Sequence, residues 1–131
     1  MYLPLKDRPV YYRSNLRGGE GDILFTDIWP AEAQPNTVRT LSVSIMKKGQ
    51  SIGLHEHVEE GELYYIMEGE AQVVCDGKEY TLKAGDATWT TQAGDFHSIK
   101  NVKDEDCKIL FLVLRLPPEV VDPAWLKARL R

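Results

Sequence analysis

The chain has 131 residues, of which 43% are hydrophobic and 27% charged, a composition typical of one globular domain and unlike that of a disordered chain. Its 16 basic and 20 acidic side chains give a net charge of −4, and the absence of a basic cluster argues against nucleic acid as a partner. No stretch approaches the roughly 20 apolar residues that cross a bilayer, and the first ten residues lack the layout of a signal peptide. We therefore expect no membrane association and a cytoplasmic location.

The N-terminal third has few strand signals. Residues 1–21 and 29–36 resemble arms or loops, and one strand is expected between them at 22–28. The glycine-rich stretch at 17–21 has neither the lysine of a P-loop nor the glycine order of a dinucleotide site. We interpret it as a flexible turn.

From residue 41 onward the sequence divides into short β-type segments separated by glycines. Apolar and serine residues alternate over 41–46, which places one face of that segment in the core. Asp76-Gly77 predicts a tight hairpin, because both residues tolerate positive φ. The further expected strands are 63–68, 71–75, 80–83, 87–91, 97–102 and 108–116.

The end of the chain predicts a short helix. Pro117-Pro118 ends the last strand, and Asp122-Pro123 has the pattern of an N-cap followed by proline at the first helical position. The expected organisation is an N-terminal arm and edge strand at 1–36, a barrel core at 37–116 and a C-terminal helix at 117–131. The fold class is all-β.

The two cysteines, Cys75 and Cys107, lie far apart and form no CxxC pair. A thiolate metal site or a redox pair therefore has little support. We expect two buried thiols, since disulfides are rare in cytoplasmic proteins.

All three histidines of the chain belong to one pattern. His55 and His57 are two residues apart, a spacing that puts both side chains on one face of a strand. Glu62 opens the next strand after a chain reversal, and His97 begins a later one. Each residue alone is more often a surface or hydrogen-bonded side chain than a ligand, but the set predicts a metal site with His55, His57, Glu62 and His97 as ligands.

The spacing of these residues resembles that of the cupin superfamily. The first cupin motif has a glycine, HxH, a glutamate and a second glycine at set intervals, and every interval is satisfied by Gly49, His55, His57, Glu62 and Gly69.

The second cupin motif is matched only in its later part. Gly94, His97 and Asn101 stand at the expected intervals, whereas Gly85 is one residue too far upstream and Gln92 replaces a proline. We therefore expect the turn before His97 to differ in shape from the family pattern. The resemblance implies a single double-stranded β-helix, or jelly-roll, barrel.

Nitrogen and oxygen ligands without thiolate suit manganese, iron, nickel, cobalt or zinc, and spacing does not choose among them. The resemblance favours Mn2+, with Fe2+, Ni2+ and Zn2+ as alternatives. Strand alternation places Tyr64 and Asn101 behind the ligands, and Gln92 lies on the preceding strand at the mouth of the pocket. These three are the candidate catalytic residues, and Arg39 and Lys47 are candidates to neutralise an anionic substrate.

The resemblance to small bacterial cupins of the oxalate decarboxylase-like type implies a metal-dependent enzyme. Its ligand would be a small anionic molecule, oxalate or a 2-oxo acid, chelated to the metal. Decarboxylation would need a glutamate that established two-barrel enzymes carry on a lid loop, and Glu59 or Glu60 supplies one only if its loop folds inward.

Three other functions remain open. They are a cupin dioxygenase, a sugar or sugar-phosphate isomerase, and a non-catalytic sensor or binding protein in which the metal anchors an effector, because one barrel hosts many chemistries. The arm-like residues 1–21 and the habit of small cupins of pairing through a sheet predict a homodimer.

Overall fold

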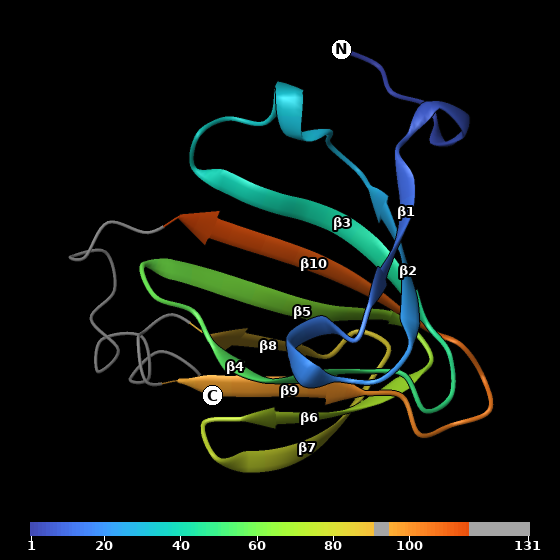
Figure 1. Cartoon of the computed structure of the whole chain (residues 1–131), viewed down its shortest axis with the longest axis vertical. Coiled ribbons are helices and arrows are strands. Elements are labelled where there is room, and N and C mark those ends of the chain that lie inside the picture. The colour runs from blue at the N-terminus through green and yellow to red at the C-terminus, as the bar shows by residue number, and fades with distance from the viewer. Residues whose placement is uncertain (91–94, 116–131) are drawn as a thin grey trace.

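The computed structural model describes residues 1–90 and 95–115 and is built almost wholly of short strands (Figure 1). Three short 3-10 helices, η1 (Leu5–Asp7), η2 (Leu16–Gly18) and η3 (Ala31–Ala33), interrupt the N-terminal part. The strands are β1 (Val10–Ser14), β2 (Asp22–Asp27), β3 (Val38–Met46), β4 (Ser51–Glu56), β5 (Glu60–Glu68), β6 (Glu70–Cys75), β7 (Lys78–Lys83), β8 (Ala87–Thr90), β9 (Phe96–Lys100) and β10 (Cys107–Arg115).

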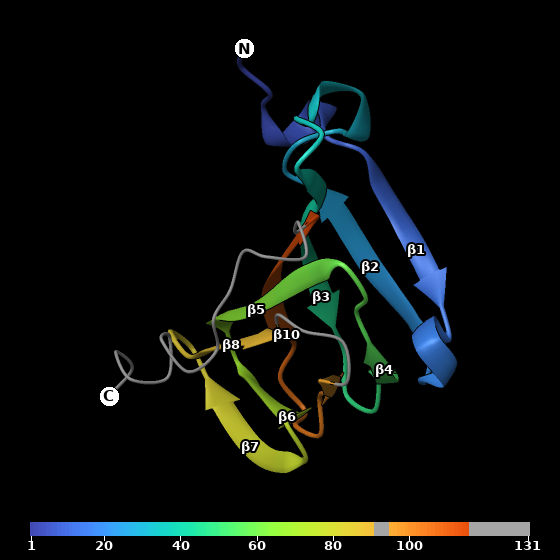
Figure 2. The same cartoon turned by 90° about the vertical axis from the view of Figure 1, so that its left-hand side faces the viewer.

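The strands form two antiparallel sheets. The six-stranded sheet has the order β1-β2-β3-β10-β5-β8, and the four-stranded sheet has the order β4-β9-β6-β7. The β1–β2 hairpin and the β6–β7 hairpin lie at opposite sides of the molecule (Figures 1 and 2). This arrangement is the all-β jelly roll that the sequence predicts.

The core lies between the sheets and follows the alternation of each strand. In β10 the buried side chains are Cys107, Ile109, Phe111 and Val113, whereas the residues between them are only half-buried. Phe25 packs on Phe111 with ring centroids 5.7 Å apart, so β2 contributes to the same core. Burial of such rings and aliphatic chains from both sheets is the main source of stability for a fold of this size.

The hairpin predicted at Asp76-Gly77 is present. Cys75 pairs with Lys78, and the two residues between them have φ of 54° and 70°. Two consecutive left-handed residues are the backbone that a tight two-residue hairpin requires.

The N-terminal part contains one strand that the sequence analysis missed. β1 lies within residues expected to be arm or loop, and it pairs with β2 along its whole length. The predicted C-terminal helix at 117–131 and the candidate residue Gln92 lie outside the described residues.

Cys75 and Cys107 are free and buried, as expected.

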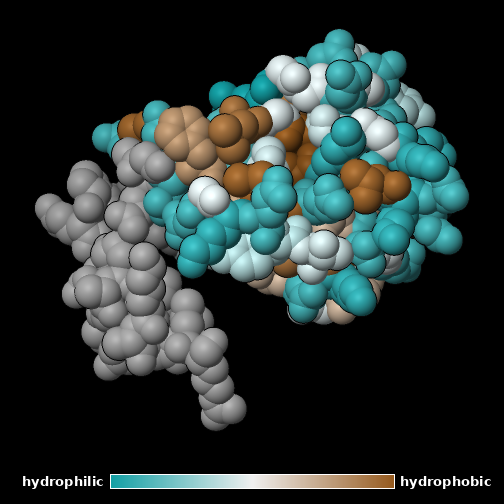
Figure 3. Space-filling view, turned by 90° about the horizontal axis from the view of Figure 1, so that it is seen from below, coloured by the Kyte–Doolittle hydropathy of each residue, from teal (hydrophilic) through white to brown (hydrophobic). Residues whose placement is uncertain are grey.

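The side of the molecule seen from below is mainly hydrophilic, with separate apolar patches (Figure 3). Among the described residues, no helix is long and apolar enough to cross a membrane.

Candidate metal centre

Two neighbouring strands bring three of the candidate ligands together. His55 lies in β4 and pairs directly with His97 in β9, and His57 follows β4 with its side chain on the same side as that of His55. Glu62 faces inward from β5, between its pairing partners Thr90 and Val113. Residues from three strands and one strand end therefore meet in the interior, where all four are buried or nearly so.

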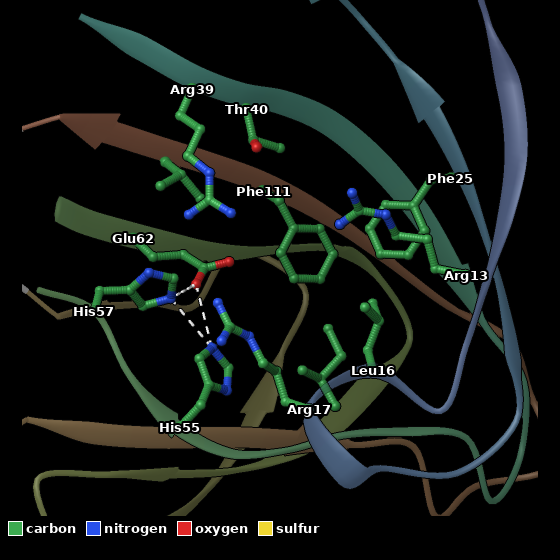
Figure 4. A pocket seen from close by; sticks show the side chains of 12 residues that line it. Arg13, Leu16, Arg17, Phe25, Arg39, Thr40, His55, His57, Glu62 and Phe111 are labelled. Carbon is green, nitrogen blue, oxygen red and sulfur yellow. Dashed lines mark hydrogen bonds and ion pairs between the residues drawn. The ribbon is translucent and has the colours of Figure 1, made fainter.

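The ligand atoms of the four side chains converge. Nε2 of His55 lies 3.1 Å from Nε2 of His57 and 3.0 Å from Nε2 of His97. Oε2 of Glu62 contacts Nε2 of His57 and lies 3.1 Å from Nε2 of His97. One potential ligand atom from each residue lies within 4.8 Å of all the others, as Figure 4 shows for His55, His57 and Glu62.

The hydrogen bonds of two histidines fix which nitrogen faces the cluster. His55 donates from Nδ1 to the Gly53 carbonyl at 2.7 Å, and His57 donates from Nδ1 to Glu60 at 3.1 Å. Each neutral ring then presents the lone pair of Nε2 to the centre. Lone pairs 3.1 Å apart repel each other unless a cation lies between them, so the donor set fits a divalent metal ion.

Electrostatics in the cluster oppose the effect of burial. Burial alone would raise the pKa of Glu62, but contacts with His55, His57 and His97 outweigh it and hold that pKa well below its usual range. Burial works to lower the pKa of His57, yet its contacts with Glu62 and Glu60 give a net rise. At His97 burial is the larger effect, so the pKa is lowered although the contact with Glu62 acts to raise it. The carboxylate is therefore charged at neutral pH and ready to bind a cation.

Tyr64 lies directly behind His97. Its ring stacks on the imidazole with centroids 4.4 Å apart and planes 4° apart, and its hydroxyl is 3.3 Å from Nε2 of His97. Complete burial raises the pKa of Tyr64 well above its ordinary value. The hydroxyl is thus a neutral group at the edge of the metal centre.

Asn101 is placed elsewhere, at the turn between β9 and β10. Its buried amide donates to the carbonyls of Met46 and Glu105, and its oxygen accepts from the Lys103 backbone. These bonds tie two turns together. Asn101 does not line the cavity at the metal centre.

Glu60 has a role that the sequence analysis did not assign. Its Oε2 accepts from His57 and from Arg39, the latter at 2.6 Å, and its side chain is 18% exposed. Glu59, the other lid candidate, is an exposed residue with φ of 58°. Neither lines the cavity.

A small cavity opens beside the ligands. It has a volume of about 70 Å³, enough for a few waters or one small organic ion. Its wall combines three arginines, two of which the sequence analysis did not identify, with apolar side chains (Figure 4). The lining residues are Arg13, Leu16, Arg17, Phe25, Arg39, Thr40, Ile52, His55, His57, Glu62, Phe111 and Val113.

Comparisons with known proteins agree with this geometry. The cupin domain model matches residues 42–113. An "Oxalate-binding protein" of Thermotoga maritima is 37% identical over 103 residues, which cover 79% of this chain and 84% of that protein. A crystal structure of "a predicted oxalate decarboxylase" from Thermotoga maritima superposes with a TM-score of 0.82 at 33% identity, covering 88% of this chain and all of the other.

A more distant relative is the "Polyketide synthase CurC" of Streptomyces cyaneus, which is 29% identical over 103 residues. The matched region covers 79% of this chain but 64% of that protein, which is less than two thirds of its length.

Proposed function

Because this chain belongs to the cupin domain family, we propose that His55, His57, Glu62 and His97 hold one divalent transition metal and that a small carboxylate chelates it. The convergence of three imidazole nitrogens and one carboxylate beside a small cavity carries the proposal. The ligand class is supported by the oxalate binding stated for the relative from Thermotoga maritima.

The donor set suits several divalent transition metals. The resemblance favours Mn2+ as the ion, with Fe2+, Ni2+ or Zn2+ as alternatives. Three neutral imidazoles and one carboxylate leave a net charge of about +1 on a divalent ion, which attracts an anion. Such a metal supplies Lewis acidity toward the oxygens bound to it.

The side chains of the chain itself shape the ligand site. Ile52, Phe25 and Phe111 give the cavity apolar walls that limit water near the ligand. The Tyr64 hydroxyl is neutral and lies 3.3 Å from Nε2 of His97, and we propose that it donates to an oxygen of a ligand bound at the metal. We still propose Gln92 as a residue at the mouth of the pocket. Asn101 also remains a candidate catalytic residue, but its hydrogen bonds in the turn favour a structural role.

Decarboxylation is a second candidate function, favoured by the likeness to the predicted oxalate decarboxylase. It needs an acid or base near the ligand. Among the described residues, Glu62 is the acidic side chain that lines the cavity, and Glu60 is held by His57 and Arg39. Binding of a small carboxylate is therefore the function that the geometry supports best.

Calorimetry on metal-loaded protein tests this function. Protein loaded with Mn2+ or Fe2+ should bind oxalate or a 2-oxo acid, and His97→Ala should bind neither the metal nor the anion. If loaded wild-type protein binds none of these carboxylates, the proposed function is wrong. Release of carbon dioxide from bound oxalate would separate decarboxylation from binding.

We also propose that the chain forms a homodimer through the outer face of the six-stranded sheet. Two apolar rows cross this face, Val43–Leu110–Tyr65 and Leu41–Leu112–Leu63, set by strand pairing. Apolar faces of this kind mark interfaces between subunits. Light scattering should give twice the monomer mass, and Leu112→Glu should give a monomer; a monomeric wild-type protein would refute the proposal.

A further inference from the structure

The arginines of the cavity differ in their charge partners. Arg39 pairs with Glu60 at 2.6 Å, and that pair is neutral as a whole. Arg13 and Arg17 line the same cavity but form no ion pair within the described residues. Two uncompensated positive charges therefore border the cavity in addition to the charge of a bound metal (Figure 4).

Arg17 is held in a strained conformation. Its φ is 54°, in the left-handed region that residues with a Cβ avoid. Asn15 shares this conformation, with φ of 50°, and closes the turn by accepting from the Gly21 backbone through its side chain and donating from its own backbone to Gly21. Strain of this kind persists at functional positions, where the surrounding structure fixes it.

The turn at residues 15–21 is fixed against β4, the strand that carries His55. A Cβ on Gly19 would lie 2.1 Å from the Ser51 carbonyl oxygen, and a Cβ on Gly53 would lie 2.1 Å from that of Arg17. Only glycine permits so close a backbone approach. Ser51 and Glu20 also exchange two hydrogen bonds of 3.0 Å, so the turn is held against β4.

Arg13 is oriented by aromatic rings. Its guanidinium carbon lies 5.9 Å from the centroids of both the Tyr11 and the Phe25 rings. These rings stack on each other, 5.9 Å apart and 10° from parallel. Cation–π contacts place the guanidinium without neutralising it, which leaves its charge for a ligand.

We propose that Arg13 and Arg17 form an anion subsite, so that the ligand is a small carboxylate with a second negatively charged group. This inference rests on the proposed function, because the first group binds the metal. A divalent ion with Glu62 contributes about +1, and the two arginines, which are exposed residues, add further positive charge beside it, so the site favours a dianion over a monocarboxylate. Guanidinium groups suit the planar oxygens of a second carboxylate.

Calorimetry with paired probes tests the subsite. Mn2+-loaded protein is titrated with oxalate and malonate, which are dianions, and with glycolate, a monoanion that also offers two oxygens to a metal. Arg17→Asn and Arg13→Gln should each weaken oxalate and malonate binding about tenfold and change glycolate binding less than twofold. Asparagine suits position 17 because it tolerates the left-handed conformation.

The control is Lys83→Gln, which removes the same charge from an exposed position on β7 that does not line the cavity. It should leave binding of all three probes unchanged, and metal content should be equal in all variants. Equal loss for dianions and glycolate, or no loss for either, would overturn the subsite alone. Wild-type protein that binds metal but none of the probes would overturn the proposed function, and the subsite with it.

Discussion

The Tyr64 ring stacks on the His97 imidazole, with centroids 4.4 Å apart and planes 4° apart. The packing of the ring can therefore be tested separately from the contribution of its hydroxyl to ligand binding. Tyr64→Phe keeps the stack and removes only the hydroxyl. We expect unchanged metal content and oxalate affinity about two- to tenfold weaker, the contribution of one neutral hydrogen bond. Calorimetry on Mn2+-loaded protein measures it.

The neighbouring Tyr65 offers a matched control. Tyr65 belongs to the opposite face of β5 and is 38% exposed, so Tyr65→Phe should leave oxalate affinity unchanged. Unchanged affinity in Tyr64→Phe as well would show that the Tyr64 hydroxyl does not contact the ligand.

The hydrogen bond from His57 to Glu60 predicts that removing Glu60 weakens metal binding although all four candidate metal-binding side chains remain. Glu60→Ala removes the carboxylate that fixes Nδ1 of His57 as the protonated nitrogen. Outer partners of this kind contribute about ten- to hundredfold to metal affinity. Competition with a chelator of known affinity measures the change, and Glu59→Ala is the control, because that adjacent carboxylate is exposed and does not line the cavity. Equal affinity in both variants would contradict the role of Glu60.

The sequence predicted that the four candidate ligands lie together, because local rules govern most of their placement. Alternation along one strand aligns His55 and His57, and short spacing returns Glu62 to the same pocket. The pairing of β4 with β9, which sets His55 directly beside His97, was not predicted, because it depends on how two strands far apart in the sequence associate. The hairpin at Asp76-Gly77 was likewise predictable, because its backbone depends on those two residues alone.

The parts that the sequence did not predict depend on tertiary contacts. Arg17 reaches the cavity because its turn packs on β4 through Gly19 and Gly53, a contact between segments more than 30 residues apart. Glu60 was considered only as a lid residue, whereas in the structure its carboxylate contacts both Arg39 and His57. β1 was overlooked although Val10 and Tyr11 favour strands, since five residues at an edge give a short signal.

Asn101 predicts a change in stability rather than in metal binding. Asn101→Ala leaves the buried carbonyl of Met46 and the carbonyl of Glu105 without the amide donor. Unfolding in urea should show a loss of about 2 kcal/mol, typical for buried groups that lose their partner, with metal content preserved. Loss of metal at unchanged stability would instead support the candidate role beside the metal.

The buried cysteines predict slow thiol chemistry in the native protein. Burial, with a smaller effect of Glu70, raises the pKa of Cys107 to about 11, and burial also raises that of Cys75. Since the thiolate is the reactive form, neither should react with a disulfide reagent at pH 8 until the protein unfolds. Both should then react in denaturant. Rapid labelling of one thiol in folded protein would contradict the burial of that cysteine.

The ionisation of the ligand cluster predicts how stability depends on pH with and without metal. The pKa of Glu62 is lowered from 4.5, so its contribution to the metal-free fold is present above pH 4.5 and is lost as pH falls further. The pKa of His57 is raised from 6.5, so its contribution is present below pH 6.5 and is lost as pH rises through the higher folded value. The metal-free protein thus gains most from this pair between these two values.

Metal affinity should rise with pH, because an imidazole must lose its proton to bind a cation. The rise in melting temperature caused by Mn2+ should therefore be large at pH 8 and should shrink toward pH 5.5, where protons compete for His57. Thermal melts at each pH, with and without Mn2+ and with a chelator as the metal-free reference, measure this difference. His57→Ala is the control, and it should show little rise at either pH. A rise in wild-type protein that is equal at pH 5.5 and pH 8 would mean that the metal does not replace a proton at this cluster.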